Sequence, residues 1–317
     1  MVADFPVHVD EVDGAWRAHP VGSSPHRDLL DVLAGEREAP AGFRVTGGEP
    51  LTVGDGERRV EADQTNASWI LGDAVVVKWD TGPLQGPHPA PERLRLLAAA
   101  GFPATPRLRG LAEWETPQGH WVPVVTVTDF LPGTTDGWTW CVEEARLALG
   151  LREGRATPFA EALGRLTGAL HLALADGPDG PVADHGDLHV GQVLRTAEGE
   201  MFVIDFDGNP TLSPEERVLH RPAAYDVAGM LLSLENVGHV VRRYDPQVAD
   251  DDVLAWTREV QTSFVGGYRD LAAPLLDESM LEPLVLDQIQ RELAYAEAHL
   301  PRWRYVPEAA LRRRGLA

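Results

Sequence analysis

The sequence predicts an α+β protein with two lobes, the first rich in strands and the second rich in helices. Strand-like patterns dominate before about residue 135, and the clearest is the apolar segment WVPVVTVTDFLPG (121–133), which ends in Pro-Gly. After that point apolar residues recur at helical spacing in five segments: 139–150, 158–176, 223–237, 251–273 and 279–300. We expect a hinge near 130–137 and a small-molecule site in a cleft between the lobes.

The first 60 residues are predicted to form a short N-terminal cap segment. VHVDEV (7–12) alternates as a strand does, and HRDLLDVLAG (26–35) has the pattern of a short helix that ends at Gly35. Glycine and proline are scattered through the remainder of the segment. It therefore offers only short periodic stretches.

Residues 61–133 are predicted to form the N-lobe. Its strands are expected near 58–62, 68–72 and 74–79, and the last of these is strongly apolar. A helix is expected over 90–102, because apolar residues recur there at helical spacing.

Residues 134–317 are predicted to form a helical C-lobe that one segment interrupts. This segment, HGDLHVGQVLRTAEGEMFVIDFDGNP (185–210), predicts a loop, a short strand, a turn and the apolar strand MFVIDF. Its polar residues are the strongest candidates for chemistry.

The overall charge excludes some classes of partner. The chain of 317 residues has 49 acidic and 28 basic residues, a formal net charge of −21. A field of that sign repels nucleic acid and anionic membranes, so neither is an expected partner. Most of this charge is expected on a solvated surface.

Other features of the composition favour a cytoplasmic protein. No stretch approaches the roughly 18 uninterrupted apolar residues of a membrane helix, and the acidic N-terminus lacks the order of a secretory signal. Cys141 is the only cysteine, which excludes an intramolecular disulfide and a cysteine-based metal site. We expect a monomer or weak homodimer that acts on a small molecule.

Lysine is used at a single position. Of the 28 basic residues 27 are arginine, and Lys78, on the apolar strand AVVVKWD, is the exception. Lysine and arginine are not interchangeable where a compact charge must meet phosphate oxygens. Chance retention is the alternative, but the position favours a phosphate contact.

The segment 185–210 has the spacing that phosphoryl transfer requires. Asp187 lies five residues before Gln192, so the carboxylate can face an acceptor hydroxyl while the amide oxygen reaches a metal. Asp205 follows thirteen residues later at the end of an apolar strand and offers the hard oxygen that Mg²⁺ prefers. Each piece alone is weak, but together they indicate an ATP-dependent kinase with Mg²⁺.

HGDLHVGQVL…VIDFD closely resembles the catalytic and metal-binding motifs of the aminoglycoside phosphotransferase-like kinases, relatives of protein kinases. Gln192 stands where that family usually has Asn, and the maltokinase-like group shares this Gln. The resemblance implies a two-lobed protein-kinase-like fold, with the catalytic loop and acceptor site in the C-lobe. It implies Asp187 as catalytic base, Gln192 and Asp205 as Mg²⁺ ligands, and Asp207 as a further ligand. By the same analogy Asp226, in YDVAGMLLSL, braces the catalytic loop; a helix cap is the alternative.

The resemblance extends to the N-lobe and makes it the nucleotide-binding lobe. It implies that Lys78 contacts the phosphates of ATP and that Glu92 pairs with Lys78; a plain exposed helix residue is the alternative for Glu92. The maltokinase-like stretch QTNASWILGD (64–73) implies phosphate contacts from a turn between strands, by Thr65, Asn66 and Ser68. The backbone around Asp129 and Leu131 is implied to meet the adenine edge.

The acceptor is indicated by the last long helix. Gln288, Glu292 and Tyr295 share one helical face, and Trp303 follows the end of the helix at Pro301. A carboxylate that takes hydroxyls or an ammonium, closed by an indole over an apolar ring face, suits a sugar. A surface helix with a merely solvated Glu292 is the alternative.

This stretch, Q-x-x-R-E-x-x-Y-A-x-x-x-L-P-R-W-x-Y-x-P, resembles the bacterial glucosamine kinases of the maltokinase-like group. The resemblance implies substrate contacts by Glu292, Trp303 and, more weakly, Gln288, beside Asp187. The reaction it implies is ATP-dependent conversion of glucosamine to glucosamine 6-phosphate. A maltokinase forming maltose 1-phosphate, an aminoglycoside phosphotransferase and an inactive scaffold of the same fold are the alternatives.

Overall fold

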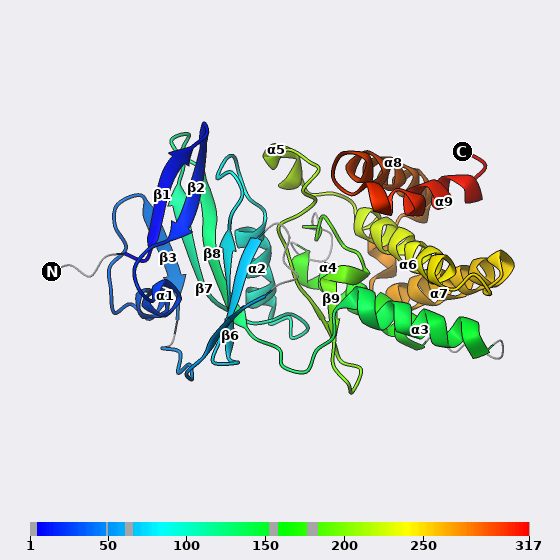
Figure 1. Ribbon diagram of the computed structural model, residues 1–317, viewed down its shortest axis with the longest axis horizontal. Helices are drawn as coiled ribbons and strands as arrows, with labels where there is room; N and C mark the ends of the chain where they lie inside the picture. The colour runs from blue at the N-terminus through cyan, green and yellow to red at the C-terminus, as the bar shows by residue number, and fades with distance from the viewer. Residues whose placement is uncertain (1–4, 49, 61–65, 152–157, 176–182, 317) are drawn as a thin grey trace. The chain divides into compact units, whose positions relative to one another are not determined.

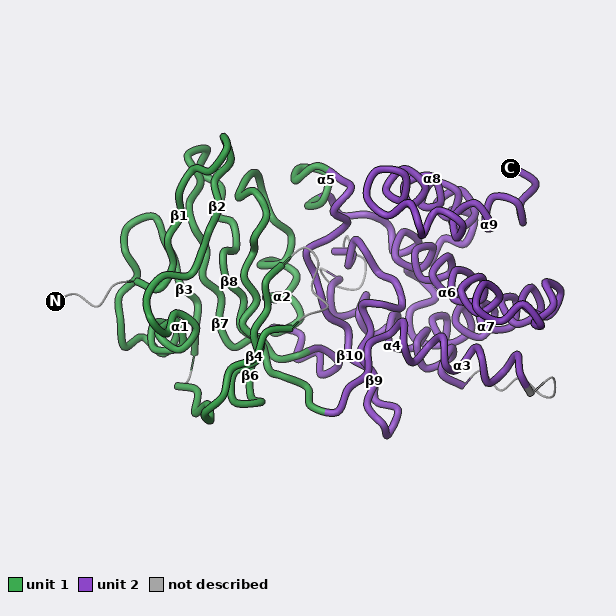
Figure 2. The backbone as a smooth tube through the Cα atoms, viewed as in Figure 1, with its two compact units in different colours: residues 1–98, 106–132, 213–218 green, residues 99–105, 133–212, 219–317 purple. Residues whose placement is uncertain are grey.

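The computed structural model describes residues 5–48, 50–60, 66–151, 158–175 and 183–316. Two compact units are present, residues 1–98, 106–132 and 213–218 in unit 1 and residues 99–105, 133–212 and 219–317 in unit 2 (Figure 2). The two units are compact groups of residues within one chain, and their bounds do not separate a segment 1–60 from the rest of unit 1. The predicted division into 1–60, 61–133 and 134–317 therefore stays a prediction.

Unit 1 is built on a six-stranded antiparallel sheet with the order β3-β7-β8-β6-β5-β4 (Figure 1). The strands are β3 (Phe43–Gly47), β4 (Glu57–Arg59), β5 (Asn66–Leu71), β6 (Val75–Asp80), β7 (Leu108–Glu115) and β8 (Trp121–Asp129). Buried and half-buried residues alternate along β6, as expected for a strand with two different faces. Val77 and Trp79 belong to the main core of the unit, so Lys78 lies on the opposite face of the sheet.

A two-stranded hairpin and a helix pack against the core face of this sheet. The hairpin is β1 (Val7–Val12) and β2 (Ala15–Pro20), and the helix is α1 (Pro25–Leu33). Val7 and Ala18 from the hairpin share one core with Leu29 of α1 and with β6 residues. A second helix of the unit, α2 (Ala90–Ala100), follows β6, and the short α5 (Pro214–Arg217) completes the unit.

Unit 2 is mainly helical. Its helices are α3 (Gly137–Leu151), α4 (Pro158–Leu174), α6 (Ala224–Tyr244), α7 (Asp250–Ala272), α8 (Leu281–His299) and α9 (Tyr305–Arg313). The small hairpin of β9 (Val193–Arg195) and β10 (Met201–Val203) lies in the same unit. Long helices α4 and α7 pack against one another, and α6 packs against both α7 and α8. This packing buries large side chains such as Trp256 and Tyr268.

The α+β class is confirmed, with the large sheet in one unit and the long helices in the other. The five predicted C-terminal helices are all present, with bounds that differ by a few residues, and α6 is longer than expected. The predicted strands near 58–62 and 68–72 correspond to β4 and β5, so Asn66 and Ser68 lie within a strand rather than in a turn. Strands β2, β3 and β7 were not predicted. Within the described residues, every helix is too short or too polar to span a membrane.

Candidate active site

Gln192 and Asp205 are brought together by the β9–β10 hairpin. Gln192 ends a short 3₁₀ turn (Val190–Gln192), and its carbonyl oxygen accepts a hydrogen bond from the Ile204 N–H at 3.0 Å. The Gln192 Nε2 atom lies 3.4 Å from Oδ2 of Asp205. Asp205 has φ of +66°, a left-handed conformation that is uncommon for a residue with a side chain and often marks a functional site.

Asp187 lies in the preceding loop and is held by Asn209. The Asn209 Nδ2 donates to Oδ1 of Asp187 at 3.1 Å, while the Asn209 Oδ1 accepts from the N–H and hydroxyl of Thr211 at 3.0 and 2.6 Å. Because the Thr211 N–H needs an acceptor, these bonds fix which end of the buried amide faces Asp187. Sequence analysis assigned no role to Asn209, although it belongs to the IDFDGNP motif.

The environment of Asp187 disfavours its charged form. Burial raises the pKa of Asp187 to about 7, and the negative charges of Asp205, Glu292 and Asp226 add to this effect against the opposing charge of Arg291. A carboxyl whose pKa is near neutrality is suited to accept a proton in a reaction at neutral pH.

Asp226, in the first turn of α6, is bonded to the loop that carries Asp187. Its carboxylate accepts from the N–H of His185 at 2.6 Å and of Gly186 at 2.9 Å. It also contacts Nε2 of His171 at 3.1 Å, and Nδ1 of that ring contacts the Tyr268 hydroxyl at 2.9 Å. The helix begins after Ala223 without a side-chain cap, so Asp226 bonds to the loop and not to its own helix end.

Asp226 is ionised despite its burial. Burial alone would raise its pKa, but the hydrogen bond and charge of His171, together with the His185 backbone N–H, hold the pKa of Asp226 below its ordinary value. A buried carboxylate with these donors fixes the backbone that precedes Asp187.

Replacing Asp226 by asparagine places an NH₂ group where an oxygen accepts a backbone N–H. We expect Asp226→Asn to lower the free energy of unfolding by about 2–3 kcal/mol, because hydrogen bonds to a buried charge are lost and a donor is left unpaired. Urea denaturation measures this change. Asp251→Asn, at an exposed position on α7, is the matched control and should cost no more than about 0.5 kcal/mol; equal effects of the two changes would contradict the bracing contact.

Glu292 on α8 is held between two amides. Its carboxylate accepts from Nδ2 of Asn236 on α6 at 3.0 Å and lies 3.5 Å from Nε2 of Gln288. The Gln288 Oε1 in turn accepts from Arg291 at 2.8 Å. Burial raises the pKa of Glu292 to about 7, although the hydrogen bonds from Asn236 and Gln288 and the charge of Arg291 oppose the rise. Glu292 and Gln288 were predicted from the sequence as substrate contacts, whereas Asn236 was not predicted.

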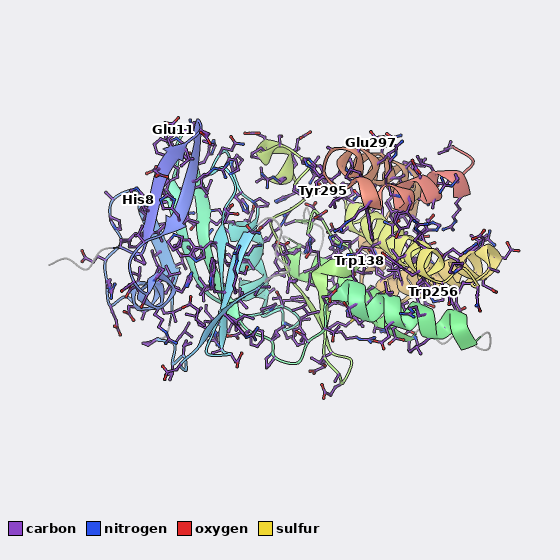
Figure 3. The ribbon with its side chains drawn as sticks, in the orientation of Figure 1. His8, Glu11, Trp138, Trp256, Tyr295 and Glu297 are labelled. Atoms are coloured by element: carbon purple, nitrogen blue, oxygen red, sulfur yellow. The ribbon has the colours of Figure 1, made fainter. Side chains whose placement is uncertain are left out.

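Trp303 lies in an aromatic group that reaches the loop after Asp187. Its ring meets Trp138 edge to face, with centroids 5.5 Å apart. Trp138 is in the first turn of α3 and is labelled in Figure 3. A Cβ atom on Gly191 would lie 2.9 Å from the Trp138 Nε1, so glycine at 191 allows the indole to pack against the loop. Trp138 was not among the predicted residues.

The predicted phosphate-binding residues of unit 1 lie on two neighbouring strands. Lys78 on β6 is the register partner of Ser68 on β5 and of Thr126 on β8. Asn66 begins β5, and Thr65 lies outside the described residues. Ser68 and Lys78 are therefore adjacent across the strands.

Glu92 and the segment from Asp129 to Leu131 are placed less specifically. Glu92 is exposed in the first turn of α2. The Asp129 carboxylate accepts from Arg109 at 2.5 and 3.2 Å, and the N–H groups of Asp129 and Phe130 bond to carbonyls of Arg107 and Ala74. Those two backbone donors are already used inside unit 1.

Two relatives that this chain matches over nearly its whole length are glucosamine kinases. The glucosamine kinase of Mycolicibacterium smegmatis is 37% identical over 374 aligned positions, which cover 96% of this chain and 91% of the relative. The glucosamine kinase of Streptacidiphilus jiangxiensis is 36% identical over 377 positions, covering 96% and 84%. The chain belongs to the glucosamine kinase family.

Solved structures of glucosamine kinases agree with this membership. A glucosamine kinase in complex with glucosamine, ADP and inorganic phosphate has a TM-score of 0.79 and 33% identity to this chain, covering 95% of this chain and 89% of that one. No protein-family model matches the chain. The resemblance to bacterial glucosamine kinases that the motifs predicted is confirmed.

Proposed function

We propose that this protein is an ATP-dependent glucosamine kinase that transfers the γ-phosphoryl group of ATP to the 6-hydroxyl of glucosamine. The observation that carries the proposal is that unit 2 holds two buried acidic side chains, Asp187 and Glu292, and that burial raises the pKa of each to about 7. One suits a proton acceptor and the other a site for an ammonium. The similar glucosamine kinases support the same reaction.

In this proposal Asp187 is the catalytic base. Its carboxylate takes the proton of the 6-hydroxyl while the hydroxyl oxygen forms a bond to the γ-phosphorus and ADP leaves. Asn209 holds one oxygen of Asp187 by donating to it, which leaves the other oxygen for the substrate. Asp226 acts as a positioning residue through the backbone N–H groups of His185 and Gly186.

Gln192 and Asp205 fit a Mg²⁺ site, with Asp207 as a further ligand. The His189 Nδ1 accepts from the Gly191 N–H, so the neutral ring carries its hydrogen on Nε2, which faces the Gln192 amide at 3.3 Å. That hydrogen favours the reversed orientation of the amide, with the Gln192 oxygen at the position where Nε2 now lies 3.4 Å from Oδ2 of Asp205. Two oxygens placed together are what a hard cation holds. When bound, Mg²⁺ would neutralise charge on the phosphates.

In unit 1 we propose that Lys78 contacts the phosphates of ATP, supported by Glu92. The compact ammonium of Lys78 suits phosphate oxygens, and Lys78 is the only lysine in the chain. Asn66 and Ser68, with Thr65, are proposed to add hydrogen bonds to phosphates. The adenine edge is proposed to meet Leu131 and the carbonyl groups near Asp129, since the Asp129 and Phe130 N–H groups are used in the unit.

The sugar is proposed to contact Glu292, Gln288 and Trp303. The Glu292 carboxylate pairs with the ammonium of glucosamine, because an ionised acid in a partly dry site binds a cation more strongly than a neutral hydroxyl. Asn236 orients that carboxylate. The Trp303 ring covers the apolar face of the sugar.

A coupled assay of ATP consumption tests the substrate assignment. We expect turnover with glucosamine, much weaker turnover with glucose, and none above background with maltose or an aminoglycoside. A maltokinase would reverse the order of maltose and glucosamine. Preferred turnover of maltose or of an aminoglycoside would contradict the proposal.

The pKa of Glu292 gives a pH dependence that is specific to the amino sugar. As the pH falls through about 7 the Glu292 carboxyl becomes protonated and loses the charge that attracts the ammonium. We expect the ratio of kcat/KM for glucosamine to kcat/KM for glucose to fall by up to about tenfold per pH unit below that pKa. Titration of Asp187 affects both sugars and cancels in the ratio. A ratio that is constant from about pH 5.5 to 8 would contradict the pairing of Glu292 with the ammonium.

A further inference from the structure

The hairpin β1–β2 carries a group of metal-ligating side chains that is far in sequence from the proposed catalytic, phosphate-binding and sugar-binding residues. His8 and His19 are register partners on its two strands, and Asp10 lies two residues after His8 on the same face. Figure 3 labels His8 on β1, with Glu11 nearer the end of that strand. One ligand atom from each of His8, Asp10 and His19 lies within 4.8 Å of the others. Among the described residues, this is the group of His, Cys, Asp and Glu side chains that lie close enough together to hold a metal ion.

The backbone that presents these side chains is well fixed. Asp13 and Gly14 connect the strands with φ of +52° and +77°, the Asp-Gly turn that matches the twist of a hairpin and sets its register. The opposite face is anchored by Val7 and Ala18 in the core of unit 1. The three side chains therefore stand on a framework that needs no rearrangement to bind a ligand.

The carboxylate of Asp10 is poorly satisfied in this arrangement. The Asp10 side chain is 44% exposed, but its Oδ1 is shielded from solvent and accepts no hydrogen bond within the described part of the chain; the His19 Nδ1 lies 3.7 Å away. A shielded carboxylate oxygen without a donor is unfavourable unless a cation approaches it. Arg17, the register partner of Asp10, donates its guanidinium to the Thr81 carbonyl at 2.8 Å instead.

We propose that His8, Asp10 and His19 form a binding site for a divalent transition metal, with Zn²⁺ as the best-fitting ion. Two imidazoles and one carboxylate are a frequent three-ligand set for Zn²⁺, whereas Mg²⁺ and Ca²⁺ prefer oxygen ligands alone. Tetrahedral ligands about 2.0–2.1 Å from zinc are roughly 3.3 Å apart. His8 is exposed and Asp10 and His19 are half-buried, so rotation of these side chains can close the remaining gap of at most about 1.5 Å, and water completes the coordination.

The site would tie the two strands of the hairpin together. The hairpin packs on the core face of the sheet, with the Trp16 carbonyl accepting from the Leu84 N–H at 2.8 Å. Lys78 lies on the other face of that sheet. Metal binding is therefore a stabilising clamp on unit 1 and adds no ligand to the proposed nucleotide contacts.

Zinc titration of the full-length, tag-free protein tests the site. Calorimetry is done in excess Mg²⁺, so that the proposed Gln192–Asp205 site is occupied, with wild type, His8→Ala, His19→Ala and the control His120→Ala, an exposed histidine elsewhere in unit 1. We expect wild type and His120→Ala to bind one more Zn²⁺ than the other two variants, or to bind it at least about tenfold more tightly. Equal zinc binding by all four proteins would overturn the proposal.

Thermal unfolding provides a second readout. Zinc should raise the melting temperature of wild type and His120→Ala, because a ligand that binds the folded state stabilises it. His19→Ala should show a clearly smaller rise. A rise of the same size in His19→Ala would assign the effect to other ligands and contradict the clamp.

Discussion

Asp187→Asn is expected to lower kcat for glucosamine by about 10²–10⁴-fold, the range that a positioned base contributes. The amide keeps the size of the side chain and accepts the hydrogen bond from Asn209, but it cannot take a proton from the 6-hydroxyl. We expect ATP binding to be unchanged, because the proposed role of Asp187 is to contact the acceptor and not the nucleotide. Steady-state kinetics and nucleotide titration measure the two quantities.

The control for this variant is Asn209→Ala. It removes the donor to Asp187 while leaving the carboxylate, so we expect a smaller loss in kcat than in Asp187→Asn. An Asp187→Asn protein that turns over at the wild-type rate would show that the base is elsewhere. A loss in Asn209→Ala as large as that in Asp187→Asn would also contradict the assignment of Asp187 as the base. In that case the orientation of the Asp187 side chain, and not its ability to take a proton, would explain the rate.

Glu292→Gln is expected to lower kcat/KM for glucosamine by about 10²–10³-fold, because losing one partner of a largely desolvated charge pair costs several kcal/mol. Glutamine keeps the length of the side chain and a carbonyl oxygen that can accept from Asn236. The loss should appear mainly in KM, since the ammonium is bound in the ground state as well as in the transition state.

Glucose is the matched substrate for this variant, because it differs only in carrying a hydroxyl where glucosamine carries the amino group. We expect kcat/KM for glucose to change by less than about threefold, and the pH dependence of the ratio between the two sugars to disappear. Equal losses for both sugars would mean that Glu292 shapes the site without recognising the ammonium.

Local pattern was enough to predict the long helices and the order of motifs in the chain. Helices α4, α7 and α8 have apolar residues at helical spacing over several turns, and the segment 185–205 has spacings that the β9–β10 hairpin converts into contacts. Gln192 precedes β9 and Asp205 follows β10, so the antiparallel hairpin brings the two residues together. Such contacts are visible in the sequence because the connecting turn is short.

Contacts between distant segments were not visible. Asn236 and Glu292 are 56 residues apart on two helices whose packing decides that they meet, and Trp138 reaches Trp303 in the same way. Strand β2 was missed although Asp13-Gly14 is a strong hairpin signal, because AWRAHP has little apolar alternation to match it. Its partner β1 supplies the pairing that its own composition does not predict.

The position of the new phosphate is the most direct test of the account. Purified protein is incubated with ATP, Mg²⁺ and glucosamine, and the product is assigned by ³¹P and ¹³C NMR. We expect glucosamine 6-phosphate, formed by wild type and nearly absent with Asp187→Asn. Phosphate on the anomeric oxygen, or no sugar phosphate at all, would contradict the account that Asp187 and Glu292 place the 6-hydroxyl for transfer.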